Sequence, residues 1–349
     1  MFKSQKTIDS FFKSTNPQAK ELDVKRYFYL DWPTKFNPAK NAYWTNERPT
    51  NINFIEQVNC NYIRKGHYFY ICGNIVNYEA GAFKIGSEKT YKNTAYLKSH
   101  LQKSVRKENA NLSVQTALHM MRLDINEFIR RLSIIMLEDA YLHESFTTIV
   151  WLMIANANKK FKFQEYMYEW LLGVVYVITM IDKRDEFNVI PDEELLVNNK
   201  VIENLSSYAS LENDEMSILY AIHMRIAYGG MDGDMMMLRK FIILWKRRFE
   251  LKENLMLRTE VKPILLRIPE LKIDNWDISA IDFHCCSNFL QYIAKKYDDL
   301  TLEEIKKIVW YHSSSINKRV PNIEYNPVKW REIKDYVIKT QKYLLSSNY

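Results

Sequence analysis

The chain has 349 residues, of which 47% are hydrophobic and 14% aromatic, so it can bury a substantial core and is not a disordered sequence. Only 8 glycines and 9 prolines are present, which disfavours a turn-rich all-β fold and favours helices. The net charge of +7 is compatible with a nucleic-acid partner and is equally ordinary for a Lys-rich proteome. Dense Lys, Asn, Ile and Tyr, whose codons are AT-rich, indicate an AT-rich genome such as that of a protist or a large DNA virus.

The cysteines and the hydropathy pattern predict an intracellular protein in a reducing compartment. The four cysteines, Cys60, Cys72, Cys285 and Cys286, form no disulfide framework. The longest apolar run, residues 171–181, is about half the roughly 20 residues that a bilayer requires, and charges flank it. We interpret this run as a buried helix and expect no membrane partner, and no signal peptide is visible.

The first part of the chain changes character twice. Residues 1–20 are polar apart from a few large apolar side chains, and we predict a disordered, flexible tail. Residues 21–90 contain the aromatic and β-branched clusters RYFYL, NINFIEQV and HYFYICGNIVNY, separated by the Pro- and Asn-rich stretch WPTKFNPAKN. These clusters predict a few strands and therefore a small β-containing region.

Helical spacing of apolar residues dominates residues 91–349, which we predict to form a helical domain. One helical pattern runs without a break from Val114 to His143. The GGMDGD stretch at residues 229–234 predicts a turn between two helices, and Thr301 with Glu304 forms a capping-box signature. The expected fold is therefore mainly α: a multi-helix domain preceded by a small α+β region and the tail.

The stretch from Gly81 to Thr90 partly matches a phosphate-binding loop. Gly81 and Gly86 have the right separation, but two further residues intervene before Lys89 and Thr90, so the lysine is displaced from the phosphates. The acidic end of Ile134–Asp139 lies inside a helical pattern instead of ending a strand. We therefore interpret these segments as a turn and a helix face, and we predict no nucleotide cofactor.

Metal chemistry has weak support in the sequence. Adjacent helical residues point about 100° apart, so His284 and the cysteines up to Cys286 cannot all face one ion. Cys60 and Cys72 are too far apart in sequence to form a metal-binding pair. We predict no metal site and interpret the cysteines as core thiols.

Paired carboxylates are compatible with the hypothesis that the chain is an enzyme. Glu138, Asp139, Asp282, Glu303 and Glu304 are of the residue type that serves a metal-dependent nuclease. Nothing in the sequence fixes their mutual geometry, and most acids on helices are solvated. The sequence therefore assigns no catalytic residue.

Clusters of basic residues recur along the predicted helices. If they converge in space they would form a surface that follows a phosphate backbone, and if they scatter they are ordinary solvated helix faces. The candidate DNA-binding residues are Lys98, Lys103, Arg106, Lys107, Arg130, Arg131, Lys246, Arg247 and Arg248.

The N-terminal stretch QKTIDSFF, residues 5–12, has a specific spacing. Ile8, Phe11 and Phe12 would project together from one tight helical turn, and Gln5 could form a hydrogen bond at the edge of a receiving pocket. Lysines on both sides of this plug favour a partner with an acidic rim. Two adjacent phenylalanines exposed on a tail are a liability without a partner.

This motif resembles the PCNA-interacting peptide, or PIP box, at every defining position. It is similar to the N-terminal peptides of nuclear uracil-DNA glycosylase, replicative DNA ligase and a mismatch-recognition subunit. The resemblance covers eight residues of the chain and implies that Ile8, Phe11 and Phe12 dock in the hydrophobic pocket of the PCNA sliding clamp. It also implies that Gln5 contacts the small neighbouring pocket.

A fainter likeness lies in FIRRLSIIMLEDAYL, which is similar to a helix in the C-terminal region of clamp-loader-related ATPases. The matching residues are Arg130, Arg131, Glu138 and Asp139. The ATPase core of those proteins is missing from this chain, so their catalysis is not carried over and the likeness implies only a helical, collar-like body.

Together these observations predict a PCNA-tethered accessory factor in DNA replication or repair, located in the nucleus or a viral replication compartment. The alternative is a DNA-processing enzyme, a metal-dependent nuclease or a glycosylase, recruited by the same tail. A third hypothesis is a structural or virion-factory protein whose N-terminal tail matches the motif by coincidence.

Overall fold

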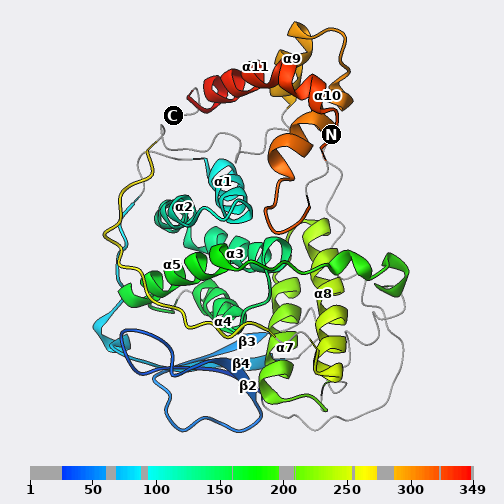
Figure 1. Cartoon of the computed structure of the whole chain (residues 1–349). Helices are drawn as coiled ribbons and strands as arrows, with labels where there is room; N and C mark the ends of the chain where they lie inside the picture. Colours follow the sequence, from blue (N-terminus) through cyan, green and yellow to red (C-terminus); the bar gives the residue numbers. More distant parts are fainter. Residues whose placement is uncertain are drawn as a thin grey trace.

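A small sheet lies against one side of a larger body of helices (Figure 1). The computed structural model describes residues 26–59, 68–87, 93–158, 160–195, 208, 210–253, 256–272, 287–321 and 324–346. The strands are β1 (Tyr27–Trp32), β2 (Lys40–Thr45), β3 (Phe54–Asn59) and β4 (Tyr68–Ile75). The predicted class, mainly helical with a small N-terminal sheet, is confirmed for these residues.

The helices of the described ranges follow the sheet in chain order. Short turns of 3-10 helix occur at η2 (Tyr78–Ala80) and η3 (Phe187–Val189), and η7 (Trp310–Ser314) is a π-helical turn. The α-helices are α1 (Thr94–Arg106), α2 (Ala110–Leu123), α3 (Ile125–Asp139), α4 (Phe146–Ala157), α5 (Glu165–Met180), α7 (Asn213–Ala227), α8 (Asp232–Leu251), α9 (Ser287–Lys296), α10 (Leu302–Val309) and α11 (Pro327–Ser346).

The sheet is mixed and has the strand order β2-β1-β4-β3. β1 and β4 are parallel, whereas β2 and β3 add to them as antiparallel edge strands. Phe28, Leu30 and Trp32 of β1 alternate with two tyrosines and an aspartate on the opposite face, as the two-residue period of a strand requires. The Trp151 side chain of α4 reaches the sheet and donates from Nε1 to the Phe28 carbonyl at 3.0 Å.

The edge strand β2 was not among the predicted strands. Its outward N–H groups find side-chain acceptors on the helices: Ala42 donates to Thr148 Oγ1 and Trp44 donates to Ser217 Oγ, both at 3.0 Å. An exposed row of unpaired N–H groups invites pairing with another chain, and these two hydroxyls remove that exposure. The strand therefore depends on α4 and α7, which the local sequence does not reveal.

The uninterrupted helix predicted from Val114 to His143 is wrong. The chain divides there into α2 and α3 because Asp124 is extended, with φ −157°, and its carboxylate accepts the N–H groups of Asn126 and Glu127. Aspartate favours this N-cap role because it satisfies N–H groups that the first helical turn leaves free.

Several other predictions are confirmed. The apolar run 171–181 belongs largely to the buried helix α5, and the Gly-rich stretch 229–234 contains the turn that separates α7 from α8. Thr301 Oγ1 accepts the Glu304 N–H at 3.2 Å, while Glu304 Oε2 accepts the Thr301 N–H at 2.9 Å, which is the predicted capping box.

Gly173 allows an extended segment to cross α5 at very short range. A Cβ atom at this position would lie 2.3 Å from the carbonyl oxygen of Lys262 and 3.0 Å from Cγ1 of Val261. The Ile264 N–H also donates to the Glu169 carbonyl of α5 at 2.9 Å. The segment and the helix are therefore held at backbone contact.

We predict that Gly173→Ala lowers the free energy of unfolding by about 1–3 kcal/mol, because the added methyl group forces the segment away from α5. Gly233→Ala in α8 is the control, since no atom lies within 4 Å of its Cβ position. It should stabilise the protein by about 0.5–1 kcal/mol. Urea denaturation followed by circular dichroism measures both, and equal stability of the two variants would contradict the close contact.

Candidate functional site

Arg106, the last residue of α1, joins three parts of the molecule. Its Nη2 lies 2.9 Å from Glu138 Oε1, and its Nε donates to the Asp139 carboxylate at the end of α3. Its Nη1 donates to the Ser314 carbonyl of η7 at 2.7 Å. Gln102 donates to both carboxylates from the preceding turn of α1. This group of residues, named the Arg106 cluster below, therefore connects α1, α3 and η7.

The carboxylates of the Arg106 cluster have a structural role. Asp139 is completely buried, and its burial is compensated by Arg106 and Gln102. Burial and the neighbouring Asp139 charge raise the pKa of Glu138. In the described ranges, no three His, Cys, Asp or Glu residues form a group that could hold a metal ion. Glu138 and Asp139 therefore balance the charge of Arg106 and hold its side chain in place.

The other predicted DNA-binding residues of α1 differ in exposure. Lys98 is partly exposed and forms an ion pair with Glu127 at 2.7 Å. Lys103 is buried, whereas Lys107 directly follows the helix, and its N–H donates to the Lys103 carbonyl at 2.9 Å. These lysines do not form a continuous exposed row along α1.

The two arginines of α3 contact the turn before α8 and the first turn of α8 itself. Arg130 donates to the Gly229 carbonyl at 3.2 Å, and Arg131 lies 3.4 Å from Asp234. Arg131 also donates to the Gln102 side-chain oxygen, which places it next to the Arg106 cluster. The structure therefore brings Arg131 and Arg106 together through one glutamine.

The cations of α8 have carboxylate partners of their own. Lys246 pairs with Glu250 one turn later, and Arg247 pairs with an acid of the segment before α7. Arg248 pairs with the buried Asp185 and stacks over the Trp245 ring at 4.8 Å. DNA contact by the nine basic residues stays a prediction, but these intramolecular partners already engage most of their charges.

Arg319, which lies in a further basic pair of the sequence, closes the ends of two helices. Its guanidinium donates to the carbonyls of Val105, Ile178, Thr179 and Ile181 at 2.6–3.1 Å. Carbonyl groups at the C-terminal end of a helix lack intrahelical partners, and a buried cation satisfies several of them at once. Arg319 therefore attaches the segment after η7 to α1 and α5.

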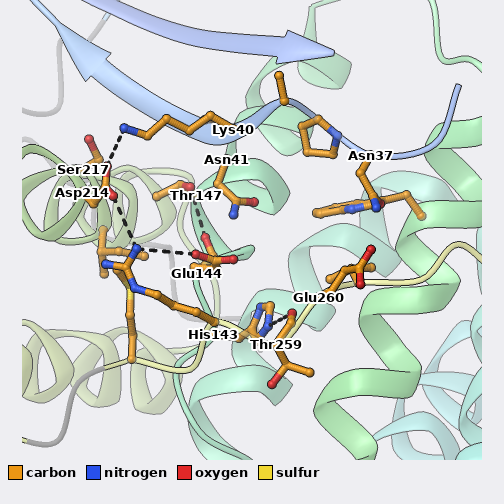
Figure 2. A pocket seen from close by; sticks show the side chains of 18 residues that line it. Asn37, Lys40, Asn41, His143, Glu144, Thr147, Asp214, Ser217, Thr259 and Glu260 are labelled. Atoms are coloured by element: carbon orange, nitrogen blue, oxygen red, sulfur yellow. Dashed lines mark hydrogen bonds and ion pairs between the residues drawn. The ribbon is translucent and has the colours of Figure 1, made fainter. Parts of the chain in front are cut away.

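A polar cavity of about 350 Å³ lies between β2, the N-terminal ends of α4 and α7, and residues 256–261 (Figure 2). Arg258 stands between two acids, with its Nη1 3.8 Å from Glu144 and 3.7 Å from Asp214. Lys40 lies 2.9 Å from the other oxygen of Asp214. Lys40, Asp214, Arg258 and Glu144 of the cavity wall are therefore paired with one another.

His143 in the cavity wall has both ring nitrogens occupied. Nδ1 accepts the Ser145 N–H at 3.1 Å, so Nε2 carries the hydrogen and donates to the Thr259 carbonyl at 2.8 Å. Burial lowers the pKa of His143, so the ring is neutral near pH 7. This histidine fixes residues 256–261 in place and has no free nitrogen for proton transfer.

Sequence reasoning missed this cavity because its charged residues are far apart in the chain. Lys40, Glu144, Asp214 and Arg258 belong to separate segments, and none stands in a recognisable motif. No local signal links them, since the fold alone brings them together.

Several predicted positions lie outside the described residues. They include the whole PIP-box match, with Gln5, Ile8, Phe11 and Phe12, and the Lys89-Thr90 pair after the Gly-rich turn. Cys60 and residues 284–286 are also outside. Cys72 is described, and it is a buried core thiol whose pKa burial raises to about 12, as expected of a structural cysteine.

Comparisons of the chain with protein-family models, with curated protein sequences and with solved structures find no match. Among the helices of the described ranges, none combines the length and the hydropathy needed to cross a bilayer.

We predict that Arg106→Met lowers the free energy of unfolding by about 3–5 kcal/mol, because it leaves the buried Asp139 and the partly exposed Glu138 without their cation. Lys98→Ala removes the exposed ion pair with Glu127 from the same helix and should cost less than about 1 kcal/mol. Chemical denaturation of both variants measures the difference. Similar losses in the two variants would show that the Arg106 cluster does not hold the helices together.

Proposed function

We propose that this protein is an accessory factor of DNA replication or repair that docks on the PCNA sliding clamp through residues 5–12. The observation that carries the proposal is the spacing of Gln5, Ile8, Phe11 and Phe12, which matches the PIP box at every defining position. Three large apolar side chains with this spacing form a compact plug, and such plugs supply most of the binding energy of short peptide motifs.

The body of the protein is consistent with an accessory role. The acids that a metal-dependent nuclease would draw from α3 are already bound to Arg106, and the histidine of the polar cavity is hydrogen-bonded on both sides. The described residues therefore offer no specific support for the enzymatic alternative over the accessory role.

Docking on a clamp would change the affinity that the body needs. A tether raises the effective concentration of the body at the clamp to about the millimolar range, so a weak DNA contact becomes sufficient. The lysines around the motif would accelerate association with an acidic rim and would make the rate depend on salt.

We predict that the full-length chain binds PCNA with a dissociation constant in the micromolar range, which corresponds to about −8 kcal/mol. Phe11→Ala with Phe12→Ala should abolish the binding, because it removes two members of the plug. Isothermal titration calorimetry measures both proteins.

Phe2→Ala is the matched control, since it removes an aromatic ring from the same stretch of chain but outside the spacing of the motif. It should bind PCNA as the unmodified chain does. No heat of binding from the unmodified chain, or equal binding by the Phe11 and Phe12 double variant, would refute the proposal.

A further inference from the structure

An aromatic and basic hollow lies on the C-terminal helices, apart from the polar cavity and from the Arg106 cluster. Its volume is about 450 Å³, and α10, η7 and one residue that precedes α11 form its walls. The lining residues are Glu303, Lys306, Lys307, Trp310, Tyr311 and Tyr325, and we name this site the Trp310 cradle.

The π-helical turn determines how the aromatic rings of the cradle are presented. The Ser315 N–H donates to the Trp310 carbonyl at 2.7 Å, five residues back, so the helix widens directly after α10. Trp310 is 40% exposed even though Ile308 and Val309 just before it are completely buried. Single π-turns of this kind recur at functional sites because they redirect side chains at a cost to helix geometry.

The rings are held in position before any ligand arrives. Tyr311 stacks on Tyr325 with ring centres 5.6 Å apart, and Trp310 meets Tyr311 edge-on at 4.7 Å. His312 Nε2 hydrogen-bonds with the Tyr325 carbonyl at 2.9 Å, and the His312 ring stacks on Trp330 at 4.9 Å. The tryptophan face therefore belongs to an ordered aromatic stack and is not a stray exposed side chain.

The charges beside the rings define the ligand. Lys306 and Lys307 form no ion pair within 4.0 Å among the residues that the structure describes, unlike Arg106 in the Arg106 cluster, and Glu303 is the acid of the lining set. The lining therefore has a net positive charge. A methylated lysine also fits aromatic cages, but the two ammonium groups would repel it.

We propose that the Trp310 cradle binds single-stranded nucleic acid, with a base stacked on Trp310 and the adjoining phosphates on Lys306 and Lys307. Aromatic stacking with neighbouring cations is the physical basis of sequence-tolerant single-strand binding. This inference deepens the proposed function by naming the surface that contacts DNA. It can be tested without the clamp, because the assay needs only this chain and an oligonucleotide.

The test is fluorescence anisotropy of the full chain with a labelled oligothymidine of about 15 nucleotides at about 50 mM salt. Trp310→Ala should weaken binding about tenfold, and Trp310→Phe should retain most of the affinity because it keeps an aromatic face. Lys306→Ala with Lys307→Ala should also weaken binding about tenfold and should reduce the salt slope by about 1.4, the value for two phosphate contacts on a single strand.

The matched control is Lys334→Ala with Lys339→Ala, which removes the same charge from exposed positions of α11 outside the cradle. It should lose much less affinity than the Lys306 and Lys307 double variant. Equal losses in the two lysine pairs, or unchanged binding by the Trp310 and Lys306/Lys307 variants, would overturn the proposal. Tight binding of a trimethyllysine peptide in place of the oligonucleotide would overturn it as well.

The Phe11→Ala and Phe12→Ala variant separates the two claims. It should bind the oligonucleotide as the unmodified chain does, even though clamp binding is lost. A cradle variant that loses the oligonucleotide but still binds PCNA, measured by calorimetry, would confirm that the two surfaces are distinct.

Discussion

The ion pair between Arg106 and the buried Asp139 is the interaction on which the arrangement of the helices depends. It fixes the end of α1 to the end of α3, and the same guanidinium reaches the Ser314 carbonyl of η7. Asn317 extends the connection by donating to the Asp139 carbonyl at 3.0 Å. A buried carboxylate is tolerated only with such partners, so the charge specifies how these segments meet.

The basic side chains of this protein therefore fall into two groups. Some stabilise the fold through partners inside the molecule, and others are available to bind a ligand. Arg106, Arg248 and Arg319 neutralise buried acids or close the ends of helices, and their positions follow from the fold. Lys306 and Lys307 lie instead beside an exposed tryptophan. A basic sequence can therefore contain few phosphate-binding groups, because much of its positive charge balances acids inside the molecule.

Local patterns predicted several elements that carry a clear local signal, but they missed the N-cap at Asp124 and the features that tertiary contacts decide. The buried α5 and the Thr301 cap follow from apolar run length and from a capping box. Strand β2 begins inside the Pro- and Asn-rich stretch 32–41 and is completed by hydroxyl groups of α4 and α7, so the sequence near it gives little sign of a strand. The polar cavity could not be predicted for the same reason, because tertiary contacts bring its residues together. The cradle depends on a π-helical turn, which the periodicity of apolar residues in the sequence does not reveal.

The most direct test of the whole account is the affinity of the full-length chain for a primed template with a single-stranded overhang, measured with and without a loaded PCNA clamp. Two linked contacts should make binding to the clamp-loaded template about a hundredfold tighter than binding to the bare template. Loss of the phenylalanine plug should remove most of that gain, whereas loss of the cradle lysines should weaken binding to both templates about tenfold. Equal affinity for the loaded and bare templates would contradict the account, because it would show that residues 5–12 do not tether this body to the clamp.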